Sequence, residues 1–83
     1  MRADAATEHQ LLLIWSEVLG LAPASTHENF FELGGHSFLV IQVIMRVREQ
    51  YGIELPFVAF LDGPTVHEQA RLIDSLRSAT SAG

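Results

Sequence analysis

The sequence contains no cysteine and no lysine. Without cysteine, the chain has no disulfide framework, no thiolate metal ligand and no thiol nucleophile of its own, which suits a cytosolic protein. The formal net charge of −5 argues against nucleic acid or an anionic membrane as a partner and favours partners with basic surfaces. No stretch has the length of a membrane span, and the first residues lack the pattern of a signal peptide. We therefore expect a cytoplasmic protein.

The length of 83 residues limits what the chain can bury. A chain of this size forms one domain with one modest core, and it is too small to build a catalytic cleft with walls of its own. The hydrophobic fraction of 48% is typical of a globular protein, and no repeat or boundary divides the sequence. We predict a single domain over residues 1–83, with a core from about residue 7 to residue 77, flexible tails and a monomeric state when isolated.

Apolar residues recur with helical spacing along most of the chain, with little sign of strands. The expected elements are a helix over about 7–19, a long loop over 20–36, a helix over about 37–51, a short helix within 57–61 and a last helix over about 65–76. Capping boxes at Thr7 and Thr65 mark the starts of the first and last helices. The predicted fold class is all-α: a four-helix bundle with three longer helices, one short third helix and a long first loop.

Ser37 lies where two glycines end the long loop and an apolar helix begins. Serine is a preferred N-cap residue because its side-chain oxygen accepts hydrogen bonds from backbone N–H groups one turn ahead. A helix N-terminus also attracts anions. Ser37 is therefore either a structural cap or the anchoring point of a phosphorylated group. Gly34 and Gly35 let the backbone turn sharply and keep side chains away from the serine.

The second helix carries two apolar stripes, where a bundle helix needs only one buried face. At about 100° per residue, the arc expected to face the core contains Leu39, Val40, Val43, Ile44 and Val47. A separate arc beside Ser37 contains Phe38, Ile41 and Met45, flanked by Gln42, Arg46 and Arg48. Either the short helix and the long loop cover this second stripe, or it docks partners, for which exposed aromatic and methionine side chains are suited. The predicted docking residues are Phe38, Ile41, Met45, Phe57 and Phe60.

Three other kinds of site are disfavoured by the sequence. A serine hydrolase elbow requires G-x-S-x-G with a general base and an oxyanion hole, but Leu39 replaces the second glycine. We therefore predict no catalytic residue. Gly34 and Gly35 are too few for a phosphate-binding loop and lack its following lysine. The histidines lie in different segments without metal-ligand spacing, so we predict no metal site and surface positions for His9, His27, His36 and His67.

The stretch from Asn29 to Ser37, NFFELGGHS, closely resembles the core motif of the peptidyl carrier domains, also called thiolation domains, of nonribosomal peptide synthetases. Three further segments resemble the same family: WSEVL at 15–19, YGIELP at 51–56 and PTV at 64–66. The resemblance covers roughly residues 8–76. So long a set of motifs in the right order is highly specific, whereas a lone G-x-S would not be.

The resemblance implies that a phosphopantetheinyl transferase attaches 4′-phosphopantetheine covalently to Ser37, beside Gly35 and His36. The thiol of this arm would hold an aminoacyl or peptidyl thioester, and a carrier of this kind catalyses nothing itself. The absence of cysteine agrees with this, since a second thiol would compete for the thioester. The implied partners are the transferase and adenylation, condensation, thioesterase or tailoring enzymes.

The sequence departs from the family pattern at a few positions. Glu28 stands where aspartate is usual, and Phe38 stands where leucine is commonest. His36 favours the peptidyl class, because carriers of fatty-acid and polyketide synthesis favour aspartate there. Two alternatives remain at this point: such an acyl carrier, and a helical interaction module without a prosthetic group in which Ser37 only caps a helix.

Overall fold

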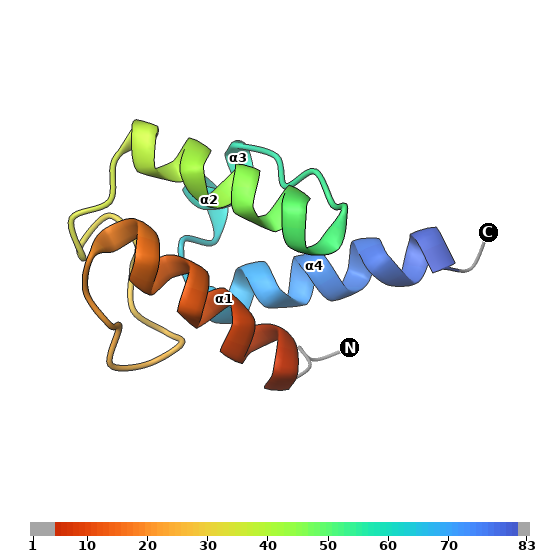
Figure 1. The fold of residues 1–83 in the computed structure, drawn as a ribbon, viewed down its shortest axis with the longest axis horizontal. Helices are drawn as coiled ribbons and strands as arrows, with labels where there is room; N and C mark the ends of the chain where they lie inside the picture. The colour runs from red at the N-terminus through yellow and green to blue at the C-terminus, as the bar shows by residue number, and fades with distance from the viewer. Residues whose placement is uncertain (1–4, 82–83) are drawn as a thin grey trace.

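Four helices make up the computed structural model, which describes residues 5–81. They are α1 (Ala5–Leu19), α2 (Ser37–Tyr51), α3 (Val58–Asp62) and α4 (Val66–Ser81) (Figure 1). The prediction of an all-α bundle with three longer helices, a short third helix and a long first loop is confirmed. Flexible tails were predicted at both ends of the chain. Residues 1–4 and 82–83, which belong to these tails, lie outside the described residues. Within residues 5–81, no helix has the length and hydropathy needed to cross a membrane.

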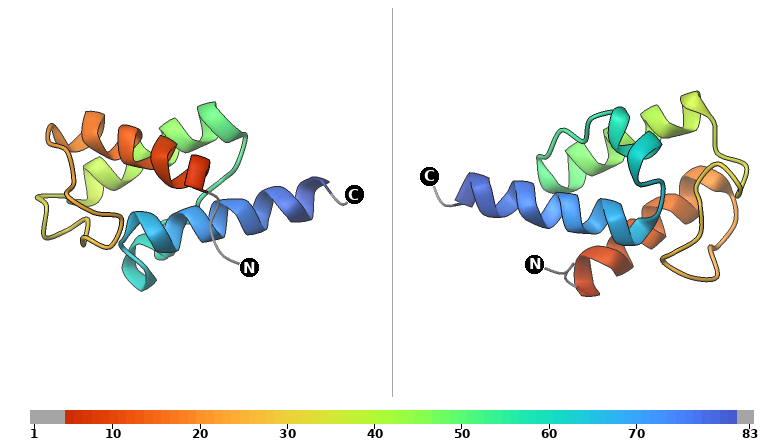
Figure 2. Two further views of the ribbon diagram at one scale, coloured as in Figure 1. Left: turned by 90° about the horizontal axis from the view of Figure 1, so that it is seen from below. Right: turned by 180° about the vertical axis from the view of Figure 1, so that it is seen from behind.

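The three longer helices enclose the core, with α1 packed against both α2 and α4. The short helix α3 lies on the opposite side of the bundle from α1 (Figure 2). Helix α2 buries the predicted arc: Val40, Val43 and Val47 are fully buried, and Leu39 and Ile44 pack partly buried against the core. The other buried apolar side chains are Leu11, Ile14, Trp15, Phe30, Ile53, Leu55, Phe60, Val66, Ala70 and Ile73.

The capping box predicted at Thr7 is wrong, whereas the one at Thr65 is confirmed in part. Helix α1 begins at Ala5, and the buried Thr7 hydroxyl donates a hydrogen bond to Asp74 Oδ1 at 2.7 Å on α4. Two alanines, the best helix formers, extend α1 before Thr7. At α4, Thr65 Oγ1 accepts a hydrogen bond from the Glu68 backbone N–H at 3.1 Å, as an N-cap does. The last helix also continues past its predicted end, to Ser81.

We expect Thr7→Val to lower the free energy of unfolding by about 1–2 kcal/mol, because the change keeps the side-chain shape and removes the hydrogen bond to the partly buried Asp74. Urea unfolding followed by circular dichroism measures this difference. Ser75→Ala, an exposed position on the same helix as Asp74, is the control and should change the free energy by less than about 0.5 kcal/mol. Equal stability of Thr7→Val and the parent protein would contradict the prediction.

The long first loop is held to the bundle by backbone hydrogen bonds at two places. The Phe30 N–H donates to the Pro64 carbonyl at 2.7 Å, and the His67 N–H donates to the Thr26 carbonyl at 2.9 Å. The Phe30 ring lies fully buried and makes edge-to-face contacts with Trp15 and Phe60, with ring centroids 4.8 and 5.3 Å away. The loop is therefore an ordered part of the fold, and its contacts fix where α2 begins.

Candidate functional site

A tight turn from Phe30 to Gly35 precedes α2 and sets its direction. The Asn29 side-chain oxygen accepts a hydrogen bond from the Phe31 N–H at 2.8 Å. The Leu33 N–H donates to the Asn29 carbonyl at 3.1 Å, and the Gly35 N–H donates to the Phe30 carbonyl at 3.0 Å. The backbone then reverses at Gly34, whose φ of +98° is a conformation that side chains rarely tolerate.

Gly35 is required at its position by close packing. A Cβ atom there would overlap the ring of Phe30 and come within 2.7 Å of the Phe30 carbonyl oxygen. The Phe30 ring is itself fixed in the core, so it has little room to move. The absence of a side chain at Gly35 therefore lets the turn close on Phe30 two residues before Ser37.

Ser37 is the first residue of α2, and the N-cap position is taken by His36, so the structure does not support the alternative in which Ser37 is only a structural cap. The N-cap is His36, in an extended conformation with φ −148° and ψ 179°, and its side chain makes no capping hydrogen bond. Ser37 is exposed, and its hydroxyl makes no hydrogen bond to any residue of the described range. The first turn of α2 contains no acidic residue. An exposed, unpaired hydroxyl thus stands at a helix N-terminus that is free to face a negative group.

The second stripe of α2 is uncovered, as the docking hypothesis requires. Phe38 is 63% exposed, Met45 55% and Ile41 46%. These three side chains line a shallow groove together with Gln42, Arg46 and Glu49. Neither the long loop nor α3 covers the stripe, so the alternative that these segments bury it is excluded.

Charged side chains border the stripe and are held by partners. Arg46 forms an ion pair with Glu17 of α1, and Arg48 binds both carboxylate oxygens of Glu54 at 2.6 and 2.8 Å. The hydrogen bond to Glu54 raises the pKa of the Arg48 guanidinium above its ordinary value. The apolar stripe therefore has a charged rim.

The two phenylalanines expected to dock partners from the third helix region differ in exposure. Phe57 is partly exposed, whereas Phe60 is fully buried against Phe30, so the prediction that Phe60 docks partners is wrong. Because α3 is amphipathic, it turns Phe60 inward and leaves Val58 and Leu61 exposed. The sequence analysis did not include Val58 and Leu61 among the docking residues. Their spacing of three positions places them on the same face of a helix, and because Phe60 is buried, this is the outer face.

The four histidines differ in their exposure and in their contacts. The rings of His27 and His67 stack with centroids 4.8 Å apart, and His67 Nδ1 lies 3.0 Å from Glu8 Oε2. His9, His27 and His36 are exposed, whereas His67 is partly buried, with 30% of its side chain accessible to solvent. Within residues 5–81, no three potential metal-ligating side chains lie close enough to share an ion.

The protein-family model described as "Phosphopantetheine attachment site" matches residues 9–73 of the chain. Tyrocidine synthase 3 of Brevibacillus parabrevis is 47% identical over 68 residues, which is 82% of this chain and 1% of that protein. A dimodular nonribosomal peptide synthase of Bacillus subtilis (strain 168) is 40% identical over 82 residues, which is 98% of this chain and 3% of that protein. The chain therefore corresponds to a small part of these curated relatives.

Solved structures show the same fold. The solution structure of an active-site mutant peptidyl carrier protein has a TM-score of 0.84 and 30% identity, and the match covers 93% of this chain and 86% of that one. A peptidyl carrier protein in complex with the phosphopantetheine transferase Sfp and coenzyme A has a TM-score of 0.83 and 31% identity, covering 90% of this chain and 97% of that one.

Proposed function

Because the chain belongs to the phosphopantetheine attachment-site family and is a peptidyl carrier domain of the nonribosomal peptide synthetase type, we propose that Ser37 is the residue that carries the 4′-phosphopantetheine arm. The observation that carries this assignment is the exposed Ser37 hydroxyl without a hydrogen-bond partner at the N-terminus of α2. An interaction module without a prosthetic group and an acyl carrier of fatty-acid or polyketide synthesis both agree less well with these relatives.

The residues around Ser37 fit a phosphodiester at the serine oxygen. Backbone N–H groups of the first turn of α2 have no intrahelical partners, and the helix dipole favours a negative charge beside them. No acidic side chain in that turn opposes the charge. Gly35 closes the turn against Phe30, and His36 leads the chain into α2 in an extended conformation, so both residues present Ser37 outward.

In the proposed loading reaction, the Ser37 oxygen attacks the β-phosphorus of coenzyme A. The bond from that phosphorus to the bridging oxygen breaks, 3′,5′-ADP leaves and the hydroxyl proton passes to a base of the transferase. Ser37 has no base of its own within hydrogen-bonding distance in the described chain, so the transferase must supply the activation. When bound, the arm supplies a thiol for thioester chemistry. The domain itself acts without catalysis, by holding an intermediate at high effective concentration near its partners.

We propose that this domain works in the cytoplasm as part of a longer synthetase, with a phosphopantetheinyl transferase and with adenylation, condensation, thioesterase or tailoring enzymes as its partners. The exposed stripe of Phe38, Ile41 and Met45 begins directly after Ser37, so an enzyme that receives the arm meets these side chains. Phe57 contributes from the segment before α3. Apolar anchors within a polar rim are the arrangement from which specific interfaces draw most of their binding energy.

The proposed function is tested by incubating the purified domain with coenzyme A, magnesium and a broad-specificity phosphopantetheinyl transferase, and by measuring the intact mass. We expect every molecule to gain the mass of one phosphopantetheine group. Adenylation enzymes are then supplied with ATP and amino acids, and one of them should add an aminoacyl group to the arm. Loading only by an acyl transferase with acyl-coenzyme A would instead indicate an acyl carrier.

We expect Phe38→Ala and Met45→Ala each to slow aminoacyl transfer to the arm about fivefold to thirtyfold, because truncation of an interface anchor costs about 1–2 kcal/mol of binding. Folding should be unchanged, since both side chains lie mostly outside the core. The control is Leu21→Ala in the first loop, which removes an exposed apolar side chain that does not line the groove of the stripe. Transfer rates that match the parent protein in both stripe variants would contradict the docking role.

A further inference from the structure

The shallow groove along the second stripe of α2 begins one residue after Ser37. Its lining residues are Phe38, Ile41, Gln42, Met45, Arg46 and Glu49. Its volume is about 340 Å³, within the roughly 300–1,000 Å³ of pockets that hold small molecules. The three apolar side chains in it are between 46% and 63% exposed. Apolar surface therefore remains in contact with water directly beside the proposed attachment point.

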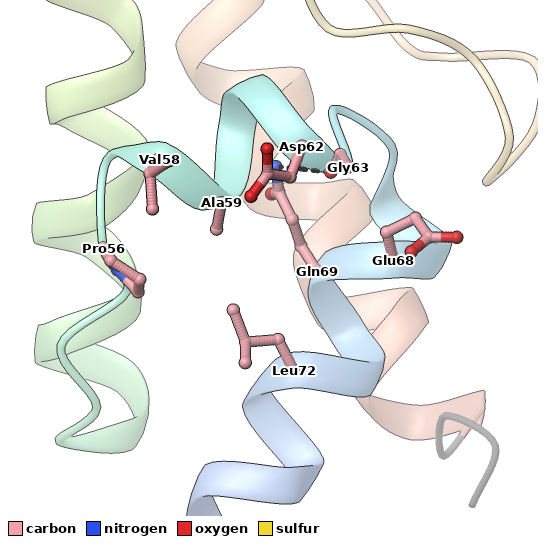
Figure 3. A pocket seen from close by; sticks show the side chains of 8 residues that line it. All are labelled: Pro56, Val58, Ala59, Asp62, Gly63, Glu68, Gln69 and Leu72. Carbon is pink, nitrogen blue, oxygen red and sulfur yellow. Dashed lines mark hydrogen bonds between the residues drawn. The ribbon is translucent and has the colours of Figure 1, made fainter.

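Two other grooves are lined by residues away from the start of α2. One lies between α3 and α4, has a volume of about 330 Å³ and is lined by residues within 56–72 (Figure 3). Gln69 extends there from α4 and donates to the Gly63 carbonyl at 3.4 Å, and its unpaired Oε1 is buried, so no occupant reaches this amide. The other groove, between α1 and α2, includes α2 only from Arg46 onward. Of the three, the stripe groove alone adjoins Ser37.

Gln42 supplies an unpaired amide within the stripe groove. Its side chain is partly buried, lines the groove and forms no hydrogen bond with any residue of the described range. A carboxamide offers both donors and an acceptor. The positive charge of Arg46 is already paired with Glu17. The groove therefore suits a flexible ligand that carries apolar groups and amides.

We propose that this groove holds the domain's own phosphopantetheine arm whenever no partner enzyme is bound, an inference that rests on the proposed function. The arm carries two geminal methyl groups, then two amides, and ends in a thiol. The methyl groups pack on Phe38 and Ile41, and an arm amide binds the Gln42 side chain. The thiol end lies at Met45, whose thioether is polarizable and adapts its shape.

The length and the attachment of the arm favour it over other occupants. Ser37 and Met45 are separated by about 12 Å along the helix axis. The main chain of the arm is about as long as four extended residues, about 14 Å, so it spans the groove. Because the arm is tethered beside the groove, its effective concentration there is on the order of millimolar. Weak contacts therefore suffice to hold it, whereas a second copy of the domain has no such advantage.

The proposal makes the arm and the partner enzymes competitors for one surface. An enzyme that docks on Phe38 and Met45 displaces the arm from the groove, and the displaced thiol is then available to the active site of that enzyme. Docking and delivery of the arm are coupled in this way, since binding of the enzyme and of the arm exclude each other.

The occupant is tested by NMR on a domain whose intact mass shows complete loading with ¹³C-labelled phosphopantetheine. We expect nuclear Overhauser contacts from the geminal methyl groups to the Phe38 ring, and from the methylene beside the thiol to the Met45 methyl group. The Gln42 side-chain amide resonances should differ between the unloaded and the loaded domain. The ring current of Phe38 should also move the geminal methyl resonances away from their positions in coenzyme A.

Variants assign these signals to the named side chains. Phe38→Ala should return the geminal methyl resonances to their positions in coenzyme A. Gln42→Met keeps the length of the side chain and removes its amide, so it should weaken the contacts between the arm and Met45. The control Leu21→Ala, which lies outside the groove, should leave every signal of the arm unchanged. Backbone spectra check that each variant is folded.

Three results would overturn the proposal. The first is a fully loaded parent domain without contacts between the arm and the stripe. The second is a shift of the Phe38 and Met45 signals as the concentration of unloaded domain rises, which would assign the groove to a second copy. The third is an adenylation enzyme that binds while every arm contact persists, whereas we expect these contacts to be lost.

The intact mass separates this inference from the proposed function. A loaded domain whose arm makes no contact with the stripe would refute only the occupant of the groove and leave the carrier role of Ser37 intact. A domain that gains no arm at all would refute the proposed function and this inference with it.

Discussion

Replacing Phe30 by alanine is expected to lower the free energy of unfolding by about 3–5 kcal/mol, the usual range for truncating a fully buried phenylalanine. The ring is inaccessible to solvent and contacts Trp15 and Phe60 edge to face. Aromatic pairs of this kind contribute about 0.5–1.5 kcal/mol beyond the area that they bury. The total stability expected for a chain of this length is only about 4–12 kcal/mol, so the Phe30→Ala protein is expected to lose a large share of its stability.

Guanidinium chloride unfolding of both proteins, followed by the fluorescence of Trp15, measures the Phe30 effect directly. The neighbouring Phe31→Ala is the matched control, because it removes the same ring from a partly exposed position and should cost less than about 1.5 kcal/mol. Similar losses in the two variants would contradict the claim that Phe30 is the anchor of the first loop.

Gly35→Ala is expected to slow phosphopantetheine loading at least about tenfold, because even a displacement of about 1 Å at a reacting group can cost a factor of 100 in rate. The added methyl group overlaps the fixed Phe30 ring, so the turn must open and Ser37 must move with it. The same overpacking should lower the free energy of unfolding by about 1–3 kcal/mol. The rate is measured from the time course of the intact mass at saturating coenzyme A.

Gly20→Ala separates this steric effect from simple backbone strain. Gly20 has a φ of +76°, but a Cβ atom there meets no atom within 4 Å, and the residue lies at the end of α1. The substitution should cost about 1 kcal/mol of stability through its backbone conformation and leave the loading rate unchanged. A Gly35→Ala protein that loads as fast as Gly20→Ala would refute the positioning role of Gly35.

The helices could be predicted from the sequence where local signals and burial agree. The limits of α2 follow from Gly35 before it and Gly52 after it, and its two apolar stripes follow from periodicity, with one buried and the other exposed as expected. The start of α1 could not be predicted, because Thr7 has a partner on α4 that lies 67 positions away in the sequence. A local capping pattern carries no information about such a distant acceptor.

In the candidate site, too, the features set by neighbouring residues could be predicted, whereas those set by residues distant in the sequence could not. The position of Ser37 at the start of α2 follows from the motif, but its place as the first helical residue depends on the turn that Phe30 and Gly35 form. Phe60 could not be separated from Phe57 by sequence, since a helix as short as α3 gives too few positions to define a face. The unpaired Gln69 oxygen has no sequence signal at all, because it depends on how α3 ends against α4.

The central claim, that Ser37 carries the arm, is tested most directly by the intact masses of two serine variants after incubation with coenzyme A and the transferase. Ser25→Ala removes another exposed serine hydroxyl, in the first loop, and should gain one phosphopantetheine group as the parent protein does. Ser37→Ala keeps the helix start and lacks the hydroxyl, so its mass should remain unchanged at every time point. A phosphopantetheine group on Ser37→Ala, or none on the parent protein, would contradict the account.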